Sequence, residues 1–289
     1  MTFGKQRETI QAILRGNKCI RPGSVYDPVS ARIAEDLGFE LGMLGGSTAS
    51  LTVLGDPDIV IISLSELAET VRRITRAAKL PLMVDADHGF GNALSVRRTI
   101  EELEISGAAG LSIEDTLLPQ AYGTSKVQLL SLDEGLGKMK AAVDARRDTT
   151  LALFARTSAP SVSGVADAVA RAKAYETSGV DALFFTGIKT RAELSAIAAE
   201  TKLPIMLGTA DGELDDAAFL ASCRVKICTQ GHLPFAAGAL AVYETLKALR
   251  EGVSPKDLKG LPSADFVNRY MRNSAVQQRL ADFLGIKKG

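Results

Sequence analysis

Short runs of hydrophobic residues alternate with longer stretches of helical periodicity along most of this chain. Each run is rich in β-forming residues, a polar or glycine-containing turn follows it, and hydrophobic positions then recur about every 3.6 residues. The predicted strands are 18–21, 40–44, 82–85, 110–114, 151–156, 182–186, 205–208 and 225–229. The predicted helices are 28–37, 65–78, 95–106, 132–146, 165–178, 190–200, 215–222 and 235–251.

Eight strand-then-helix units predict an α/β fold, a (β/α)8 barrel of the TIM type that occupies residues 1–252. An amphipathic segment at 5–14 would close the bottom of this barrel. A doubly wound open sheet is the alternative, because the order of the strands cannot be read from a sequence.

The remaining residues, 253–289, are predicted to form a C-terminal helical extension that the barrel does not require. This extension is either part of the same domain or an oligomer interface. Its stretch 265–284 has helical periodicity and an apolar stripe that needs a partner, and we expect a neighbouring subunit to supply it. The stripe consists of Phe266, Val267, Tyr270, Met271, Val276, Leu280 and Phe283.

The composition narrows the choice of partner. Of the 289 residues, 46% are hydrophobic and 24% are charged, with a formal net charge of +0. This balance gives no electrostatic footprint for nucleic acid or a membrane surface, so we expect a small-molecule substrate. No run approaches the roughly 18 apolar residues of a membrane span, and the first ten residues lack a secretory signal, which favours a cytoplasmic protein. Three cysteines without CxxC spacing and only two histidines favour neither disulfides nor a zinc site.

The predicted strands end in polar residues. These ends are GGSTAS at 45–50, DADH at 85–88, ED at 114–115, RTS at 156–158 and TQGH at 229–232. Each has a structural explanation, since Asp and Ser cap helices and an arginine can pair with a carboxylate. In a barrel, however, all these ends surround one mouth, where catalytic groups lie. Carboxylates gathered there raise each other's pKa unless a cation neutralises them, and oxygen ligands favour a hard ion such as Mg²⁺.

Three of these segments carry a family resemblance. The chain resembles the isocitrate lyase and phosphoenolpyruvate mutase superfamily in three segments that occur in the same order. They are MVDADHGFGN at 83–92, IEDTLLP at 113–119 and FARTSAP at 154–160. The resemblance implies an enzyme that acts on a 2-oxo acid with Mg²⁺, or with Mn²⁺ as a possible substitute. By position it implies Asp85 as the direct metal ligand, Asp58, Asp87 and Glu114 as ligands through water, Arg156 on a substrate carboxylate, and the backbone of Gly45, Gly46 and Ser47 around the oxo-acid.

The chain departs from the lyases of this superfamily in the segment expected to form a lid. Those lyases carry KKCGH or KRCGH there, with the cysteine as the acid, whereas the matching stretch here is QAYGT at 120–124. The phosphonate enzymes use a lysine and an asparagine in the lid, and neither occurs between Pro119 and Ser125. Other lyase positions also change, to Met43, Gly45, Thr186 and Gly208. The groups that would hold a second product are therefore absent.

His232, at the end of the eighth predicted strand, is an ionisable side chain that this chain adds while it loses the lyase groups for a second product. The chain resembles the oxaloacetate decarboxylase branch of the superfamily in four segments taken together, which are GGSTAS, ADHGFGN, FARTSAP and TQGHLPFAAG. This resemblance implies decarboxylation of oxaloacetate to pyruvate and CO₂ through a metal-chelated enolate, with Asp85, Arg156 and His232 as catalytic residues. His232 would also bind the substrate, as an imidazolium favoured by neighbouring anions.

Two alternatives remain from the sequence. One is a C–C bond lyase of the methylisocitrate or dimethylmalate type with an unrecognised acid in the lid. The other is a non-catalytic oxo-acid-binding protein on the same barrel. The superfamily resemblance also implies exchange of the C-terminal segment between subunits, and hence a homo-oligomer, either a dimer or a homotetramer built of dimers.

Overall fold

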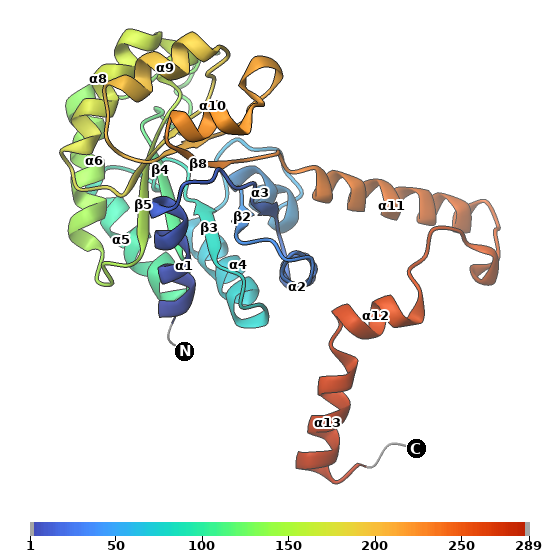
Figure 1. Cartoon of the computed structure of the whole chain (residues 1–289). Coiled ribbons are helices and arrows are strands. Elements are labelled where there is room, and N and C mark those ends of the chain that lie inside the picture. The colour runs from blue at the N-terminus through green and yellow to red at the C-terminus, as the bar shows by residue number, and fades with distance from the viewer. Residues whose placement is uncertain (1–2, 287–289) are drawn as a thin grey trace. The chain divides into compact units, whose positions relative to one another are not determined.

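The computed structural model describes residues 3–286 (Figure 1). These residues divide into two compact units, one that ends at His232 and one that begins at Leu233. The predicted division at residue 252 stays a prediction. Residues 287–289 of the predicted extension lie outside the described residues.

The first unit is built on an eight-stranded sheet in which every strand is parallel to its neighbours and the strands follow in chain order. Ile20 forms a parallel bridge with Ile227, and this bridge joins the two ends of the sheet. The predicted barrel is therefore confirmed, and the doubly wound alternative is excluded because its strand order is not sequential. The strands are β1 (Gly23–Ser24), β2 (Gly42–Leu44), β3 (Leu82–Asp85), β4 (Gly110–Glu114), β5 (Ala152–Thr157), β6 (Ala182–Phe185), β7 (Ile205–Leu207) and β8 (Val225–Cys228).

The helices of this unit surround the strands or cover the bottom of the barrel (Figure 1). They are α1 (Gly4–Arg15), α2 (Pro28–Asp36), α3 (Gly46–Val53), α4 (Leu64–Ala77), α5 (Ala93–Ile105), α6 (Leu132–Ala145), α7 (Ala159–Val162), α8 (Val165–Glu176), α9 (Arg191–Ala199), the 3₁₀ helix η1 (Gly212–Leu214) and α10 (Ala217–Ser222). The first predicted strand, 18–21, is misplaced, because only Ile20 pairs there and Pro22 has no N–H to donate to a ladder. Helices α3 and α7 were not predicted.

Two hydrophobic layers hold the barrel together. Ile10 and Leu14 of α1 pack into the cluster that fills the barrel interior, together with Met83 and Phe154. This confirms that the N-terminal segment closes the bottom. A methyl group on Gly110 would lie 2.6 Å from Ile10 Cδ1, so the close approach of α1 requires a glycine there. The larger layer lies between the sheet and the surrounding helices.

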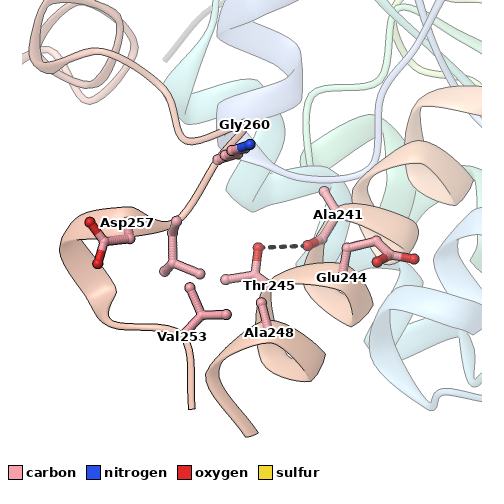
Figure 2. A pocket seen from close by; sticks show the side chains of 9 residues that line it. Ala241, Glu244, Thr245, Ala248, Val253, Asp257 and Gly260 are labelled. Carbon is pink, nitrogen blue, oxygen red and sulfur yellow. Dashed lines mark hydrogen bonds between the residues drawn. The ribbon is translucent and has the colours of Figure 1, made fainter. Parts of the chain in front are cut away.

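The second unit contains α11 (Leu233–Arg250), the 3₁₀ helix η2 (Pro255–Asp257), α12 (Ala264–Tyr270) and α13 (Asn273–Leu284). The predicted single helix at 265–284 is interrupted because Arg272 adopts a left-handed conformation, with φ of +60°. The described residues of α11 and α13 include none that is buried. Within this unit, a cavity of about 410 Å³ lies between α11 and residues 253–260 (Figure 2). No described helix of the chain is both long enough and apolar enough to cross a membrane.

Candidate active site

Asp85 lies at the end of β3 and is 9% exposed. Its Oδ1 accepts hydrogen bonds from Ser112 Oγ at 3.1 Å and from the backbone N–H of Asp87 at 3.2 Å. Its Oδ2 pairs with Arg156. Asp85 does not cap the next helix, because Asn92 accepts the N-terminal hydrogen bonds of α5. The capping explanation for Asp85 is therefore wrong.

Asp87 follows in a strained and buried position. Its φ is +46°, which is uncommon for a residue other than glycine, and its Oδ2 has no hydrogen-bond partner among the described residues. Burial raises the pKa of Asp87 well above its ordinary value, and the charges of Asp85, Asp58 and Glu114 raise it further. A methyl group on Gly46 would lie 2.2 Å from Asp87 Oδ1, so glycine is needed for the carboxyl group to lie there.

Glu114, at the end of β4, is the third buried acid. Its Oε2 accepts a hydrogen bond from Thr116 Oγ1 at 3.0 Å and lies 3.4 Å from Arg156 Nε. Burial raises its pKa, although Arg156 acts in the opposite direction. Asp58 is exposed as a residue, but partial burial of its carboxyl group and the charge of Asp85 raise its pKa as well. The four predicted acids therefore influence one another electrostatically.

Arg156 is the cation among these acids. It pairs with Asp85 and Glu114 and lies over the ring of Phe184, 5.3 Å from the ring centroid. Burial would lower the pKa of Arg156, but the carboxylates raise it and keep the guanidinium charged. Its predicted contact with a substrate carboxylate stays a prediction.

His232 occupies space that Gly45 leaves open. A methyl group on Gly45 would lie 2.3 Å from His232 Nε2, and His232 Nδ1 lies 2.8 Å from Ser24 Oγ. Burial lowers the pKa of His232, against the effects of Asp85 and Asp58. The sequence predicted that neighbouring anions would favour the charged imidazolium, but burial has the larger effect and acts against it.

The glycines at 45–46 also begin a helix, where the sequence predicted only a polar strand end. Gly45 is the N-cap of α3, and Gly46 and Ser47 form the start of its first turn. The backbone N–H groups at a helix N-terminus favour anions. This arrangement agrees with the predicted role of Gly45, Gly46 and Ser47 toward an oxo-acid, which stays a prediction.

The residues at the mouth fit Mg²⁺ rather than a metal that needs several protein ligands. The described residues contain no group of three or more His, Cys, Asp or Glu side chains that could hold a metal ion alone. Mg²⁺ commonly keeps several waters and takes only one or two carboxylates. The unpartnered Asp87 Oδ2 and the raised pKa values of Asp58, Asp87 and Glu114 indicate that the ionised carboxylates are poorly stabilised by the protein, and a bound cation would stabilise them.

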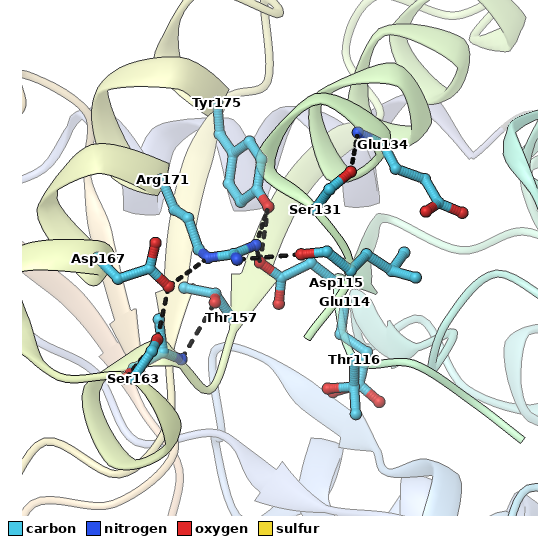
Figure 3. A network of polar contacts seen from close by, with 12 residues as sticks. Glu114, Asp115, Thr116, Ser131, Glu134, Thr157, Ser163, Asp167, Arg171 and Tyr175 are labelled. Carbon is cyan, nitrogen blue, oxygen red and sulfur yellow. Dashed lines mark hydrogen bonds and ion pairs between the residues drawn. The ribbon is translucent and has the colours of Figure 1, made fainter. Parts of the chain in front are cut away.

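A buried polar network beside Glu114 was missed in the sequence (Figure 3). Asp115 Oδ2 accepts hydrogen bonds from Arg171 Nη1 at 2.8 Å and Tyr175 Oη at 2.6 Å. Arg171 Nη2 also donates to the carbonyl of Leu130 at 3.0 Å. The predicted lid at 120–124 and the bridge between Thr116 and Leu129 both lie between Asp115 and Leu130. The network therefore holds the two ends of the longer segment that contains the lid. The signals in the sequence were Asp115 at a polar strand end and the spacing of Arg171 and Tyr175 on one helix face.

The other positions that differ from the lyases lie as follows. Thr186 Oγ1 is 2.8 Å from Ser158 Oγ, and a methyl group on Gly208 would lie 3.0 Å from Thr186 Cγ2. Met43 is buried in the barrel interior. In the lid, Tyr122 is fully exposed, and the backbone carbonyl of Thr124 accepts a hydrogen bond from Gln120. None of these residues is a Cys, His, Asp or Glu.

A (β/α)8 barrel with buried carboxylates and one arginine at its mouth defines a class of proteins that bind a small anionic ligand beside a cation. Within that class, the chain belongs to the phosphoenolpyruvate phosphomutase family, whose sequence model matches residues 10–250.

Relatives and solved structures agree with this assignment. The chain is 63% identical over 286 residues to oxaloacetate decarboxylase of Bradyrhizobium sp. (strain ORS 278), with 99% of each chain covered. It is 61% identical over 288 residues to oxaloacetate decarboxylase of Bradyrhizobium diazoefficiens, with 100% of each covered. A phosphonopyruvate hydrolase complex with oxalate and Mg²⁺ is similar, with a TM-score of 0.86, 28% identity, and 96% of this chain and 99% of that chain covered.

Proposed function

We propose that the protein is an oxaloacetate decarboxylase, which converts oxaloacetate to pyruvate and CO₂ with Mg²⁺. The observation that carries this proposal is the placement of His232 against Gly45, beside the buried carboxylates of Asp85, Asp87 and Glu114, which have Arg156 as their one paired cation among the described residues. The names of the relatives support the same activity. The structure of oxaloacetate acetylhydrolase with 3,3-difluorooxalacetate, at 26% identity and a TM-score of 0.84, supports a related ligand.

Asp85 would hold Mg²⁺ directly, with Asp58, Asp87 and Glu114 acting through water. The bound ion would polarise the keto oxygen and stabilise the negative charge that grows as the C3–C4 bond breaks. Arg156 would bind a carboxylate of the substrate, and the N-terminal N–H groups of α3 would orient the oxo-acid.

His232 would donate a hydrogen bond to the oxo-acid. In the proposed tautomer, Ser24 donates its hydroxyl proton to His232 Nδ1, so Nε2 carries the ring proton beside Gly45. The lowered pKa of His232 is compatible with this neutral donor. Loss of CO₂ needs no acid at the departing carbon, and water would supply the proton that C3 takes up to give pyruvate. This agrees with a lid segment at 120–124 that contains no Cys, His, Asp or Glu.

The test is CO₂ release from oxaloacetate with purified protein. We expect turnover that depends on Mg²⁺, that a chelator abolishes and that Mn²⁺ restores. Faster cleavage of 2-methylisocitrate than of oxaloacetate would replace this proposal with a C–C bond lyase. Binding of oxaloacetate without any turnover would replace it with a non-catalytic binding protein.

We also propose a cytoplasmic homo-oligomer, a dimer or a tetramer of dimers, in which the C-terminal helices are exchanged. The support is the second unit itself, where Leu240, Tyr243, Leu246 and Phe283 are between 58% and 79% exposed. Leu240, Tyr243 and Leu246 recur every three residues on α11 and therefore lie on one side of it, and an apolar helix face of this kind is typical of an interaction site. Sedimentation at micromolar concentration should show a dimer or larger species, and a monomer would contradict the proposal.

A further inference from the structure

The loop between β3 and α5 has an unusual backbone. Asp87, Gly89, Phe90 and Gly91 all have positive φ, at 46°, 75°, 60° and 145°. A residue other than glycine in this region costs about 1–3 kcal/mol and persists only where its surroundings hold it. Because Asp87 is one of the proposed metal ligands, whatever holds this loop also determines where its carboxyl group lies.

Three contacts from other elements hold the loop carbonyls. The backbone N–H of Glu114 donates to the carbonyl of Asp87 at 2.8 Å. Thr99 Oγ1 donates to the carbonyl of Gly89 at 3.0 Å. Between them, Lys138 Nζ donates to the carbonyl of His88. The loop is therefore tied to β4, α5 and α6.

Lys138 is the least expected of these anchors. It lies on α6 and is 2% exposed. A buried ammonium group is costly unless it is paired, and a neutral apolar side chain could fill the same space. Burial lowers its pKa, while the nearby carboxylates of Glu114, Glu134 and Asp115 raise it. The side chain thus brings a positive charge close to Glu114 and a donor to the loop that carries Asp87.

We propose that Lys138 is a positioning residue for the metal site, which holds the carbonyl of His88 and thereby keeps Asp87 in its left-handed conformation with its carboxyl group at the mouth. This inference rests on the proposed function, because it assumes that Asp87 binds Mg²⁺ through water. A purely structural Lys138 would affect the stability of the fold but not the affinity of the folded protein for Mg²⁺.

The test is the Mg²⁺ dissociation constant, measured by isothermal titration calorimetry without substrate. Lys138→Met keeps the length of the side chain but removes the donor and the charge. We expect binding at least about tenfold weaker, because partners of metal ligands typically contribute 10–100-fold to metal affinity. Lys138→Arg, which keeps a charged donor, should recover most of the loss. Lys140→Met is the matched control, since Lys140 is exposed on the same helix.

Circular dichroism and thermal midpoints show whether each variant is folded. If Lys138→Met does not fold, Thr99→Val takes its place, because it removes the hydrogen bond to Gly89 from the same loop. It should weaken Mg²⁺ binding at least about threefold, whereas Thr70→Val, which loses a similar bond to Glu66 within α4, should not. Wild-type affinity for Mg²⁺ in a folded Lys138→Met protein would overturn this inference and leave the proposed function standing. If Lys138→Met does not fold, wild-type affinity in Thr99→Val would have the same consequence. Wild-type protein that binds no Mg²⁺ would overturn both the proposed function and this inference.

Discussion

The pKa values of acidic side chains are shifted in opposite directions at the two ends of the barrel. At the bottom, Arg7 pairs with Asp148 at 2.6 Å and with Glu104 at 3.7 Å. Hydrogen bonds from Thr150 and Arg7 lower the pKa of Asp148 to about 2, although burial acts against them. At the mouth, burial and mutual repulsion raise the pKa values of Asp87 and Glu114 instead.

The acids at the bottom therefore contribute to stability, whereas those at the mouth are placed for function. At the bottom, Glu104 accepts hydrogen bonds from two backbone N–H groups, Asp148 pairs with Arg7, and Asp181 pairs with Arg146. Their charges therefore stabilise the fold. At the mouth, Asp85 and Glu114 share one arginine, and Asp87 Oδ2 has no partner among the described residues. Acids in this environment lower the stability of the metal-free protein, and binding of a cation restores that stability. The predictions below test this contrast, from the largest expected effect to the smallest.

Asp85→Ala should give the largest change. We expect a folded protein with weakened Mg²⁺ binding and with oxaloacetate decarboxylation reduced by about 10²–10³-fold or more, since a preorganised charge is lost at the reacting oxygen. Steady-state kinetics and calorimetry measure both effects. Asp148→Ala is the matched control from the bottom of the barrel, and it should keep its kcat while losing stability. Near-normal turnover in Asp85→Ala would refute the assignment of Asp85 as the metal ligand.

Arg171→Met should give the largest loss of stability at the mouth. It leaves Asp115, which is 0% exposed, as a buried charge without its cation. Removal of one partner from a buried ion pair typically costs about 3–5 kcal/mol, and urea denaturation should show a loss of about 3 kcal/mol. The double variant with Asp115→Asn should recover part of it. A loss below about 1 kcal/mol would show that the network in Figure 3 contributes little.

The fold followed from the sequence where burial is nearly complete. β3 and β4 were predicted with their observed bounds, because all their residues are buried and hydrophobic runs mark such strands. The start of the barrel was misplaced because Pro22 interrupts pairing, and α3 was missed because its small residues show no helical periodicity. The break at Arg272 depends on a backbone conformation that the hydrophobic pattern does not reveal.

The clustering of the candidate site residues was predictable for a different reason. Parallel strands in a barrel end at one mouth, so polar strand ends far apart in the sequence come together there. The lowered pKa of His232 was not predictable, because burial outweighs the charges that the sequence shows. The contacts of Lys138 and of Asp115 were not predicted either, since they depend on which helix faces lie against which strand ends.

His232→Gln should have a smaller effect than Asp85→Ala. We expect kcat/KM for oxaloacetate to fall at least about tenfold, or ~1.4 kcal/mol, with Mg²⁺ affinity unchanged. A fall in kcat would indicate a hydrogen bond made in the transition state, whereas a rise in KM alone would indicate orientation of the bound substrate. Gly45→Ala should have a similar effect, because its methyl group would displace the imidazole. Unchanged kinetics in both variants would make His232 a structural residue.

The smallest expected effect is on the pH dependence of stability, where the two ends of the barrel should differ in sign. The folded pKa of Asp148, about 2, lies below its ordinary value of 3.8. Its contribution is therefore present above about pH 4 and is lost as the pH falls toward 2. The Asp148 side chain is 35% exposed, so solvent screening reduces this contribution to about 1 kcal/mol. Asp148→Asn should be less stable than wild type by that amount at pH 6, and the difference should narrow at pH 3 in urea titrations.

Asp87→Asn should behave in the opposite way in metal-free protein. The folded pKa of Asp87 is raised, so its ionisation destabilises the fold as the pH rises through that value. Asparagine also tolerates the left-handed conformation of this position, which avoids additional strain. The variant should therefore have a higher thermal midpoint than wild type at pH 7 without Mg²⁺, and this advantage should shrink when Mg²⁺ is added. If Asp87→Asn and Asp148→Asn both lower the midpoint at pH 7, the acids of the mouth are stabilised like those of the bottom, and the contrast between the two ends is wrong.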